Sequence, residues 1–349
     1  MRFYNQQHRF YCGVDLHART MYLCIRDQTG VILFHKNLPA QADAFLGAIA
    51  PYREDLVVGC ECMFAWYWLS DLCAEQKIPF VLGHALYLKA IHGGKTKNDK
   101  LDADKLCSLL RGGNFPTAYV YPKGLRETRD LLRRRLFLVR QRAHLVAHIQ
   151  NTNSQYNLPV FGKKLVFAAN REELMVAERF TDSSVRLSIE TDLELIDKYD
   201  EQIHKLELHL ERHAKIDDAN TLARLRSIPG VGKILALIFL YEIHDIKRFG
   251  AVGQFLSYSR LVRCSHESAG KKKGSGGKKI GNAYLRWAFA EATCLWLRQS
   301  DRAKAWMKRQ EKKRGKAKAL AILGARMARA LYHMLRKKEV FAEAKALGG

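Results

Sequence analysis

The order of strand-like and helix-like segments across residues 9–111 limits the possible folds more than any other feature of the chain. Three short strand-like runs come first, and helical and strand-like runs then follow one another. The expected strands are 9–16, 22–27, 31–36, 56–62 and 80–83, and the expected helices are 42–50, 66–75, 85–92 and 98–111. Strands joined by short turns pair antiparallel, whereas a helical crossover joins parallel strands. The order therefore predicts an α/β layer fold with a mixed sheet.

The sequence changes character after Pro122, where two stretches carry apolar residues at heptad spacing. The first is rich in arginine, the second is acidic, and their apolar positions are Leu132, Leu136, Val139, Ala143 and Val146, then Ile189, Leu193, Ile196, Ile203 and Leu210. Together they predict a coiled-coil hairpin over residues 123–215. An intramolecular spacer and a dimerisation arm both remain open, and we favour the arm because an isolated hairpin buries little apolar surface.

Residues 216–349 are expected to form a third, mainly helical unit. Its segment Ile228-Pro-Gly-Val-Gly-Lys233 is typical of a helix-hairpin-helix turn, whose backbone N–H groups can bind phosphate, although a tight turn between packed helices fits it equally well. The rest comprises an apolar helix at 235–243, a glycine- and lysine-rich loop at 268–279, and closing helices at 282–299 and 316–338.

The charge of the chain predicts an anionic partner. Its 59 Lys and Arg residues against 35 Asp and Glu residues give a formal net charge of +24, while the 48% of hydrophobic residues is ordinary for a globular protein and excludes a disordered basic tail. Residues 216–349 hold 29 basic and 10 acidic residues, whereas residues 1–122 hold 13 and 11. The surplus therefore lies mostly in the third unit, and nucleic acid is the leading partner.

Neither a membrane nor an oxidising compartment is expected. No segment approaches the roughly 20 apolar residues of a membrane helix, and the N-terminus does not resemble a signal peptide. The 8 cysteines form no C-x-x-C pair and mostly lie in apolar runs, which predicts buried, reduced thiols. We therefore expect a soluble cytoplasmic protein.

Four acidic residues form the most informative candidate site. Asp15 and Glu61 each close an apolar strand, where a buried anion is costly without a compensating cation, while Asp99 and Asp102 share one face of a helix. Magnesium prefers such oxygen ligands, and paired ions can stabilise both oxygens of a phosphoryl displacement. Each acid also has a structural interpretation, in which Asp15 is a turn residue, Glu61 an ion-paired acid and Asp99 a helix cap. Asp104 points to another face of the helix and is left out.

The order of these motifs resembles a known family. Gly-Val-Asp15, Glu61 and Lys-Asn-Asp99-Lys-Leu-Asp102-Ala closely resemble the RuvC-like (RNase H-like) domain, with its DEDD quartet, of insertion-sequence transposases described as bridge-RNA-guided recombinases. Segments of the C-terminal part are similar to the second domain of that family, namely Ile228–Lys233, Asp245-Ile-Lys-Arg-Phe249, Glu267-Ser268-Ala-Gly-Lys271 and Lys279-Ile-Gly-Asn282-Ala-Tyr-Leu-Arg286. The resemblance spans nearly the whole chain.

The resemblance implies an α/β plus all-α protein with a RuvC-like catalytic domain at 1–122, a coiled-coil arm at 123–215 and a helical transposase domain at 216–349. It implies that Ser268 attacks a DNA phosphodiester and holds the strand as a phosphoserine ester, assisted by Mg²⁺ at the quartet. Ser265 and Ser275 are alternative nucleophiles. Implied partners are double-stranded target and donor DNA, a structured guide RNA, and further copies of the chain, in a dimer or tetramer whose active sites are shared between protomers.

Basic residues around the serine are the candidate nucleic-acid ligands. The candidates are Lys271, Lys272, Lys273, Lys278, Lys279, Arg286 and Lys233. Two other functions remain open. One is a metal-dependent nuclease or junction resolvase of the same fold, in which water attacks the phosphodiester. The other is an architectural nucleic-acid binder with structural carboxylates.

Overall fold

The computed structural model describes residues 2–91, 98–214, 219–262, 266–268, 270–274 and 279–348, and gives only the backbone for 266–268 and 272–274. The chain divides into two compact units, residues 1–123 and 124–349. The predicted further division of the second unit at residue 216 stays a prediction.

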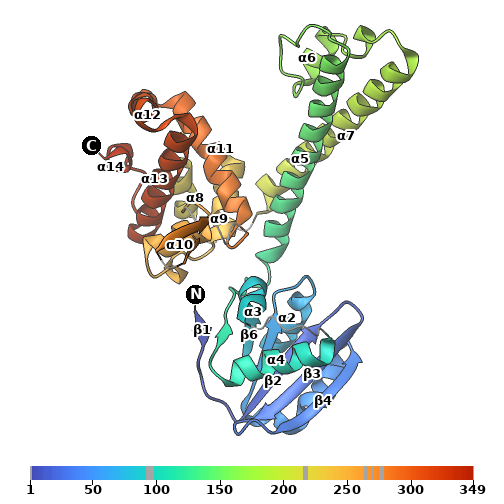
Figure 1. Ribbon diagram of the computed structural model, residues 1–349, viewed down its shortest axis with the longest axis vertical. Coiled ribbons are helices and arrows are strands. Elements are labelled where there is room, and N and C mark those ends of the chain that lie inside the picture. Colours follow the sequence, from blue (N-terminus) through green and yellow to red (C-terminus); the bar gives the residue numbers. More distant parts are fainter. Residues whose placement is uncertain are drawn as a thin grey trace. The chain divides into compact units, whose positions relative to one another are not determined.

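The first unit is built on a five-stranded sheet with the strand order β4-β3-β2-β5-β6 (Figure 1). Its strands are β2 (Phe10–Leu16), β3 (Thr20–Asp27), β4 (Ile32–Pro39), β5 (Leu56–Glu61) and β6 (Phe80–Gly83). β3 pairs antiparallel with β2 and β4, while β5 pairs in parallel with β2 and β6. The predicted mixed sheet is confirmed, because a meander supplies three strands and helical crossovers bring in the other two.

Helices cover both faces of this sheet (Figure 1). α1 (Ala42–Ile49) and α2 (Trp66–Glu75) belong to one apolar cluster, and α3 (Ala85–Ile91) and α4 (Asp99–Arg111) to another. Successive strand residues alternate between the two clusters, as the pleat of a strand requires. A small antiparallel pair that the sequence did not predict, β1 (Phe3–Tyr4) with β7 (Phe115–Pro116), completes the unit.

In the second unit, α5 (Arg126–Gln155) and α7 (Ser183–His213) form the predicted hairpin (Figure 1). Ion pairs join Arg135 to Glu207, Arg142 to Asp200 and His148 to Asp192, so residue numbers rise along α5 as they fall along α7. The two helices are therefore antiparallel.

The apolar seam of the hairpin follows the heptad prediction on α7 and departs from it on α5. The buried residues of α7 include Ile189, Ile196, Ile203 and Leu210, each seven after the last. On α5, Leu132 and Leu136 are buried but Ala143 is exposed, so the predicted seam is wrong there. A straight helix drifts away from a strict heptad, and the buried face of α5 moves accordingly.

The far end of the hairpin has an apolar core of its own. The connecting segment contains α6 (Ala168–Glu173) and a short 3-10 helix, Ala177–Arg179. Its core consists of Ile149, Leu165, Val176, Phe180, Ile189 and Ile196. The connection is thus a packed cap that ties both helices together.

The rest of the second unit is a helical bundle around one large core. Its helices are α8 (Ala219–Arg226), α9 (Lys233–Ile243), α10 (Val252–Tyr258), α11 (Ala283–Gln299), α12 (Asp301–Arg314), α13 (Lys316–Lys337) and α14 (Glu343–Leu347). Phe239, Phe289 and Trp296 are completely buried at its centre. The expected closing helices correspond to α11 and α13, but α12 and α14 were not predicted. α12 buries only Ala303, Trp306 and Met307, so its apolar periodicity is weak.

Cysteines and membrane character follow the expectations in part. Of the described cysteines, none forms a disulfide and five are buried, while Cys62 and Cys294 are exposed, contrary to the prediction. Cys264 lies outside the described residues. Among the helices of the described part of the chain, none combines the length and apolar character needed to cross a lipid bilayer.

Candidate active site

Two acidic residues lie at the carboxyl edge of the sheet. Asp15 is near the end of β2, and Glu61 ends β5. These strands pair in parallel with Val14 opposite Cys60, so Asp15 and Glu61 are the next residues of neighbouring strands. Burial raises the pKa of the Cys60 thiol, and the charges of Asp15 and Glu61 raise it further. Both carboxylates therefore lie close to the same sulfur.

The first turn of α4 carries the other two acids of the predicted quartet, Asp99 and Asp102. Asn98 is the N-cap, and its side chain accepts a 2.8 Å hydrogen bond from the Leu101 N–H. The interpretation of Asp99 as the helix cap is therefore wrong. Because Asn98 caps the helix, neither carboxylate is needed for capping.

Close packing of α4 on β2 holds that turn against the end of the strand. A β-carbon on Gly13 would lie 2.4 Å from both the Ala103 carbonyl oxygen and the Cys107 amide nitrogen. Real side chains are not found at such distances, so only glycine allows this approach. The contact sets the distance between the strand acid and the helix acids.

His17 lies between two of the acids. Its Nε2 atom is 3.4 Å from Asp15 Oδ2 and 3.5 Å from Asp99 Oδ1. One ligand atom from each of these three residues lies within 4.8 Å of the other two. His17 was not predicted from the sequence, although a histidine two residues beyond a strand-end acid was a usable signal.

The electrostatics of Asp15 reflect this crowding. Burial raises the pKa of Asp15 above its ordinary value of 3.8, His17 lowers it, and the charges of Asp99 and Asp102 raise it again, with a net upward shift. The side chain of Asp15 is 14% exposed and that of Asp99 53% exposed. The site thus holds carboxylates that repel one another, next to solvent.

The remaining acids of α4 have cationic neighbours. Asp102 Oδ1 lies 3.1 Å from Lys105 Nζ on the same helix. Asp104 Oδ1 lies 2.5 Å from Arg26 Nη2 on β3. Asp104 therefore serves a structural ion pair and lies outside the site, as expected.

The donor set fits a divalent metal ion. Asp15 and Asp99 supply oxygen ligands within reach of one another, and Asp102 adds charge close enough to act on Asp15. A cation among them would relieve the repulsion that raises the pKa of Asp15. Hard oxygen ligands of this kind suit magnesium or manganese, and His17 adds a nitrogen that manganese or zinc would also accept.

The serine segment is a β-hairpin where the structure describes it. Ser268 ends β8 (His266–Ser268), which pairs antiparallel with β9 (Lys271–Gly274), and Ser268 is opposite Lys271. The prediction of a loop is wrong for these residues, because backbone pairing holds strands that lysine and glycine do not predict. Ser265, Ser275 and Lys278 lie outside the described residues, and only the backbone is described for Ser268, Lys272 and Lys273.

Contacts on either side of the hairpin hold its two ends together. Arg260, at the entry, donates a 2.9 Å hydrogen bond from Nε to the Gly281 carbonyl at the exit. Gly281 has a φ of +96°, and a β-carbon there would lie 2.5 Å from the Tyr258 carbonyl oxygen. The ends of the serine segment are therefore held next to each other.

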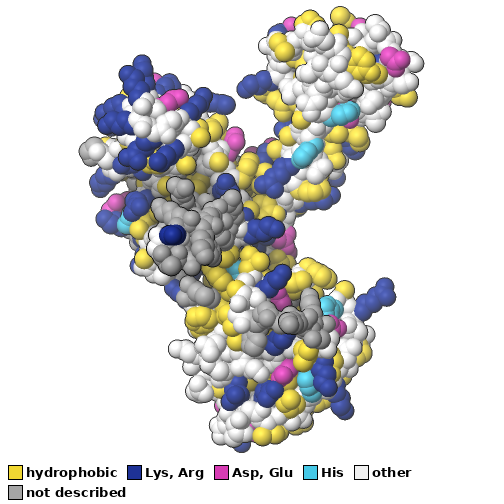
Figure 2. All heavy atoms as spheres, viewed as in Figure 1, with side chains coloured by type: hydrophobic (Ala, Val, Ile, Leu, Met, Phe, Trp, Pro, Cys, Tyr) yellow, Lys and Arg dark blue, Asp and Glu magenta, His cyan; other side chains and the backbone are white. Residues whose placement is uncertain are grey.

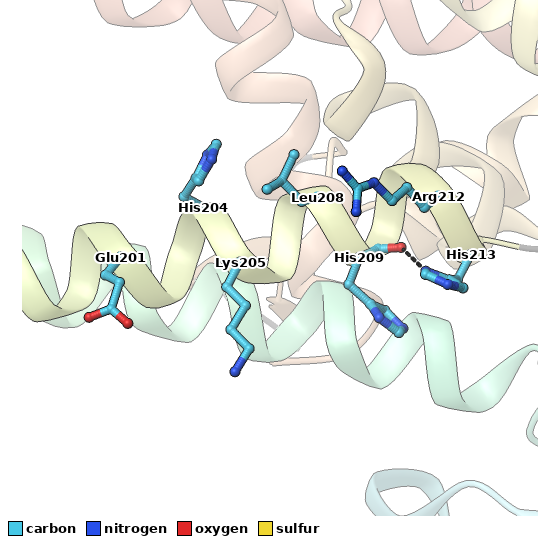
Figure 3. Close-up of a pocket in the computed structure, with 7 residues that line it drawn as sticks. All are labelled: Glu201, His204, Lys205, Leu208, His209, Arg212 and His213. Carbon is cyan, nitrogen blue, oxygen red and sulfur yellow. Dashed lines mark hydrogen bonds between the residues drawn. The ribbon is translucent and has the colours of Figure 1, made fainter.

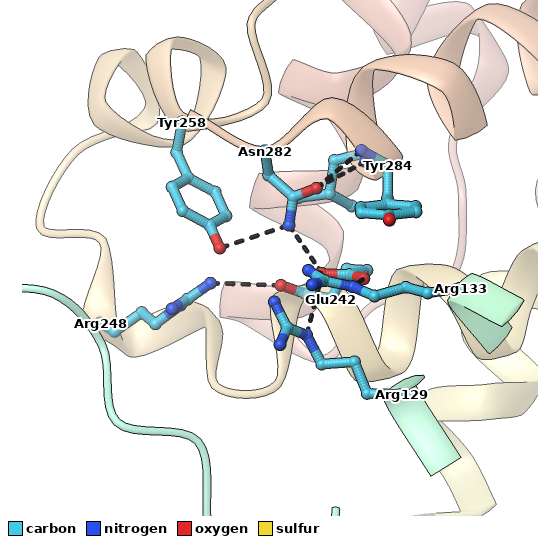
Figure 4. Close-up of polar contacts among 8 residues, drawn as sticks. Arg129, Arg133, Glu242, Arg248, Tyr258, Asn282 and Tyr284 are labelled. Carbon is cyan, nitrogen blue, oxygen red and sulfur yellow. Dashed lines mark hydrogen bonds and ion pairs between the residues drawn. The ribbon is translucent and has the colours of Figure 1, made fainter. Parts of the chain in front are cut away.

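A buried carboxylate joins three elements just beyond this hairpin (Figure 4). Glu242 of α9 is 2% exposed and accepts hydrogen bonds from Arg129 and Arg133 of α5 and from Asn282, the N-cap of α11. The Arg133 guanidinium also lies over the Tyr284 ring, 4.3 Å from its centroid. Glu242 was not predicted as a functional residue, because a lone acid in an apolar helix gives no sign of its partners.

The turn before α9 is closely packed. Gly230 has a φ of +85°, and a β-carbon there would lie 2.6 Å from Leu295 Cβ on α11. Of the two interpretations of this turn, the contact favours a tight turn between packed helices. Lys233, the first residue of α9, pairs with Glu211 at 3.0 Å.

The other described basic candidates are exposed. Lys271, Lys279 and Arg286 are all accessible to solvent. Figure 2 shows further Lys and Arg side chains gathered around α12, whose last turn carries Lys312, Lys313 and Arg314. The cationic surface therefore extends beyond the serine segment.

A second cationic surface, which sequence analysis missed, lies on the last turns of α7 (Figure 3). We call it the α7 surface; it comprises His204, Lys205, Leu208, His209, Arg212 and His213, with Glu201 at its edge. The His209 and His213 rings stack with centroids 4.4 Å apart. Their spacing of four residues along a helix was the signal that could have revealed it.

The acids near the α7 surface have partners of their own. Glu201 pairs with Lys198, Glu207 with Arg135 and Glu211 with Lys233. The side of α7 that bears Lys205 and Arg212 is therefore cationic. Two cations and three imidazoles over three helical turns suit the phosphates of a nucleic-acid backbone.

Two family models of transposases match separate parts of the chain. Residues 12–157 match the family model of the IS110 DEDD transposases, and residues 222–310 match that of the transposase IS116/IS110/IS902 family. The transposase for insertion sequence element IS1111A from Coxiella burnetii is 24% identical over 335 residues, which cover 94% of this chain and 90% of that protein. The transposase for insertion sequence element IS1328 from Yersinia enterocolitica is 26% identical over 147 residues, or 41% of this chain and 43% of that protein.

Proposed function

The chain belongs to the IS116/IS110/IS902 family of transposases, enzymes that cut and rejoin DNA, and from this premise we propose that it does so through Ser268, with Mg²⁺ at Asp15, Glu61, Asp99 and Asp102. The observation that carries the proposal is the carboxylate cluster, in which Asp15 and Asp99 offer ligand atoms within 4.8 Å and the pKa of Asp15 is raised. A separate unit of the same chain holds the serine hairpin.

In the proposed reaction, the Ser268 hydroxyl oxygen forms a bond to a phosphorus of the DNA backbone, and the bond between that phosphorus and a sugar oxygen breaks. The hydroxyl proton leaves Ser268, and the departing sugar oxygen takes up a proton. Rejoining is the reverse step with a different sugar hydroxyl. Because the ester keeps the phosphodiester linkage, strands can be exchanged without an external energy source.

The carboxylates would hold the metal ion, which when bound polarises the phosphate and favours loss of the serine proton. His17 contacts both Asp15 and Asp99 and would keep the two carboxylates oriented toward one position. The close contact between Gly13 and α4 keeps the helix acids at that position.

We place the serine and the carboxylates together in a homo-oligomer, a dimer or tetramer, in which one protomer supplies each. They belong to different compact units of the chain, which supports an arrangement of this kind. Mixing two inactive variants tests it: Asp15→Asn and Ser268→Ala protomers should regain cleavage when combined, since one composite site then has both groups intact. Failure to regain activity would place both groups in one protomer.

Nucleic-acid partners follow from the charge. We propose that lysines and arginines near the serine bind target and donor DNA, and that the α7 surface binds the phosphate backbone of a structured guide RNA. The pairing of nearby acids supports the second assignment, because it leaves Lys205 and Arg212 on a cationic side of the helix.

The alternative is a metal-dependent nuclease that uses water, favoured by the location of the metal-ligand cluster wholly within the first unit. Trapping of a covalent protein–DNA adduct separates the two. We expect an adduct whose modified peptide contains Ser268, and its loss in Ser268→Ala. Strand cleavage that persists in Ser268→Ala with Mg²⁺ would establish the nuclease instead.

A further inference from the structure

We propose that Glu242 and Asn282 act as positioning residues that connect the base of α5 to the exit of the serine hairpin. The inference rests on the proposed role of Ser268. It concerns two buried side chains that would act through the backbone leading from the serine segment.

Glu242 is held from α5 by two arginines. Arg129 Nε donates to Glu242 Oε2 at 3.0 Å, while Arg133 donates from Nε to Oε1 at 2.6 Å and from Nη2 to Oε2 at 2.9 Å. A fork of this kind fixes the carboxylate plane as well as its position. Because Glu242 is 2% exposed, water cannot replace these bonds if α5 moves.

Asn282 adds a further hydrogen bond to Glu242. Its Nδ2 donates to Glu242 Oε2 at 2.7 Å, and its Oδ1 accepts from the N–H groups of Tyr284 and Leu285 at 2.9 and 3.0 Å. One side of the amide therefore caps α11, and the other bonds to the carboxylate. The two functions use different atoms, so they can be separated by substitution.

Asn282 directly follows Gly281, at the exit of the serine hairpin. Its own N–H donates to the Tyr258 carbonyl at 2.5 Å, next to Gly281, whose carbonyl accepts from Arg260. A shift of Asn282 therefore moves the point from which the hairpin leaves the bundle. The path runs from Arg129 and Arg133 through Glu242 and Asn282 to this point (Figure 4).

A purely structural role makes a different prediction. If the cluster only stabilised the fold, its loss would lower adduct formation in proportion to the fraction of unfolded protein. A positioning role predicts a slower chemical step in protein that is folded and binds DNA normally.

The first test uses Asn282→Ser. A serine side chain caps a helix as well as an asparagine does, but it is shorter and has no amide group to donate to Glu242. The matched control is Asp182→Ser, which changes the N-cap of α7 at the far end of the helical hairpin formed by α5 and α7. We expect both variants to melt within a few degrees of the wild type and to bind DNA within about twofold. Asn282→Ser should form the covalent adduct at least tenfold more slowly, and Asp182→Ser at the wild-type rate.

The second test keeps every charge and does not touch the cap. Arg133→Lys loses the fork to Glu242, while the control Arg135→Lys, two residues along α5, loses the fork to Glu207. Adduct formation should slow about tenfold in Arg133→Lys and change less than twofold in Arg135→Lys. Equal rates within each pair of variant and control would overturn the inference.

The result can be separated from failure of the proposed function. If Ser268→Ala in the wild-type background still forms the adduct, the serine assignment itself is wrong, and the positioning role falls with it. If Ser268→Ala abolishes the adduct and Asn282→Ser and Arg133→Lys behave like their controls, only the positioning role is wrong.

Discussion

Gly13 of β2 and Ala103 of α4 are in direct backbone contact, so close that a β-carbon on Gly13 would stand 2.4 Å from the Ala103 carbonyl oxygen. Gly13→Ala should therefore push α4 away from the sheet and separate Asp99 from Asp15. We expect the substitution to destabilise the protein by about 2 kcal/mol or more and to lower strand cleavage roughly a hundredfold or more. Urea denaturation and cleavage assays measure the two effects.

Gly47→Ala is the matched control for that change. Gly47 lies within α1, and nothing stands within 4 Å of the position of its β-carbon. The substitution should stabilise the helix by about 0.5–1 kcal/mol and leave cleavage unchanged. If Gly13→Ala were equally harmless, the packing of α4 would not control the geometry of the site.

The raised pKa of Asp15 predicts that its charged form lowers the stability of the folded protein. A carboxyl whose pKa is raised by folding binds its proton more tightly in the folded state, so its stabilising contribution is lost as the pH rises through that folded pKa. At neutral pH without divalent metal, Asp15→Asn should therefore melt a few degrees higher than the wild type. The difference should vanish at pH values below the ordinary pKa of 3.8.

Mg²⁺ should reverse this order by raising the melting temperature of the wild type and leaving that of Asp15→Asn nearly unchanged. Asp43→Asn, at the exposed start of α1, is the control and should respond to Mg²⁺ as the wild type does. Equal stabilisation of wild type and Asp15→Asn by Mg²⁺ would contradict a metal site at Asp15.

The pKa of Glu242 is shifted in the opposite direction, so its contribution to stability should have the opposite pH dependence. Burial raises its pKa, but the hydrogen bond from Arg133, the charges of Arg129 and Arg133 and the hydrogen bond from Asn282 outweigh burial and lower the pKa below its ordinary value of 4.5. Its contribution is therefore present above pH 4.5 and is lost as the pH falls through the lowered folded pKa. Glu242→Gln should cost about 3–5 kcal/mol at pH 7, because two arginines lose their buried anion.

Denaturation of wild type and Glu242→Gln over a series of pH values from 7 downward checks this prediction. The free energies of unfolding of the two proteins should approach one another as the pH falls through the lowered pKa of Glu242. A difference in free energy of unfolding that stayed constant over this range would show that the negative charge of Glu242 contributes little.

The α7 surface predicts a contribution to RNA binding that depends on salt. Lys205→Ala with Arg212→Ala should weaken RNA binding, and the slope of log K against log salt should fall by about 0.7–0.9 for each phosphate that the variant no longer binds. Binding of double-stranded DNA, measured in parallel, should be weakened less. The charge-matched control is Lys163→Ala with Lys164→Ala, two exposed residues in the segment that connects α5 to α7. An equal loss of RNA affinity in both double variants would show that the loss follows from net charge alone.

The sequence by itself determined the strands of the five-stranded sheet, the helices that cover it and the kind of chemistry that this unit could carry. Asp15 and Glu61 lie at or next to the ends of their strands because strands buried on both faces leave few positions for an acid, and the i, i+3 spacing of Asp99 and Asp102 follows from helix geometry alone. The buried side of α7 could also be predicted, because the seven-residue spacing of its apolar residues places them on one side of the helix.

Contacts between distant residues were decided only by the tertiary structure. Nothing local marks His17 as the neighbour of Asp99, or Glu242 as the partner of Arg129 and Asn282, because these pairs form only when separate elements pack. The exposure of Ala143 and the pairing of Lys233 with Glu211 have the same cause. Periodicity specifies which side of an element is buried, whereas the partner that meets a given side chain depends on how the whole chain folds.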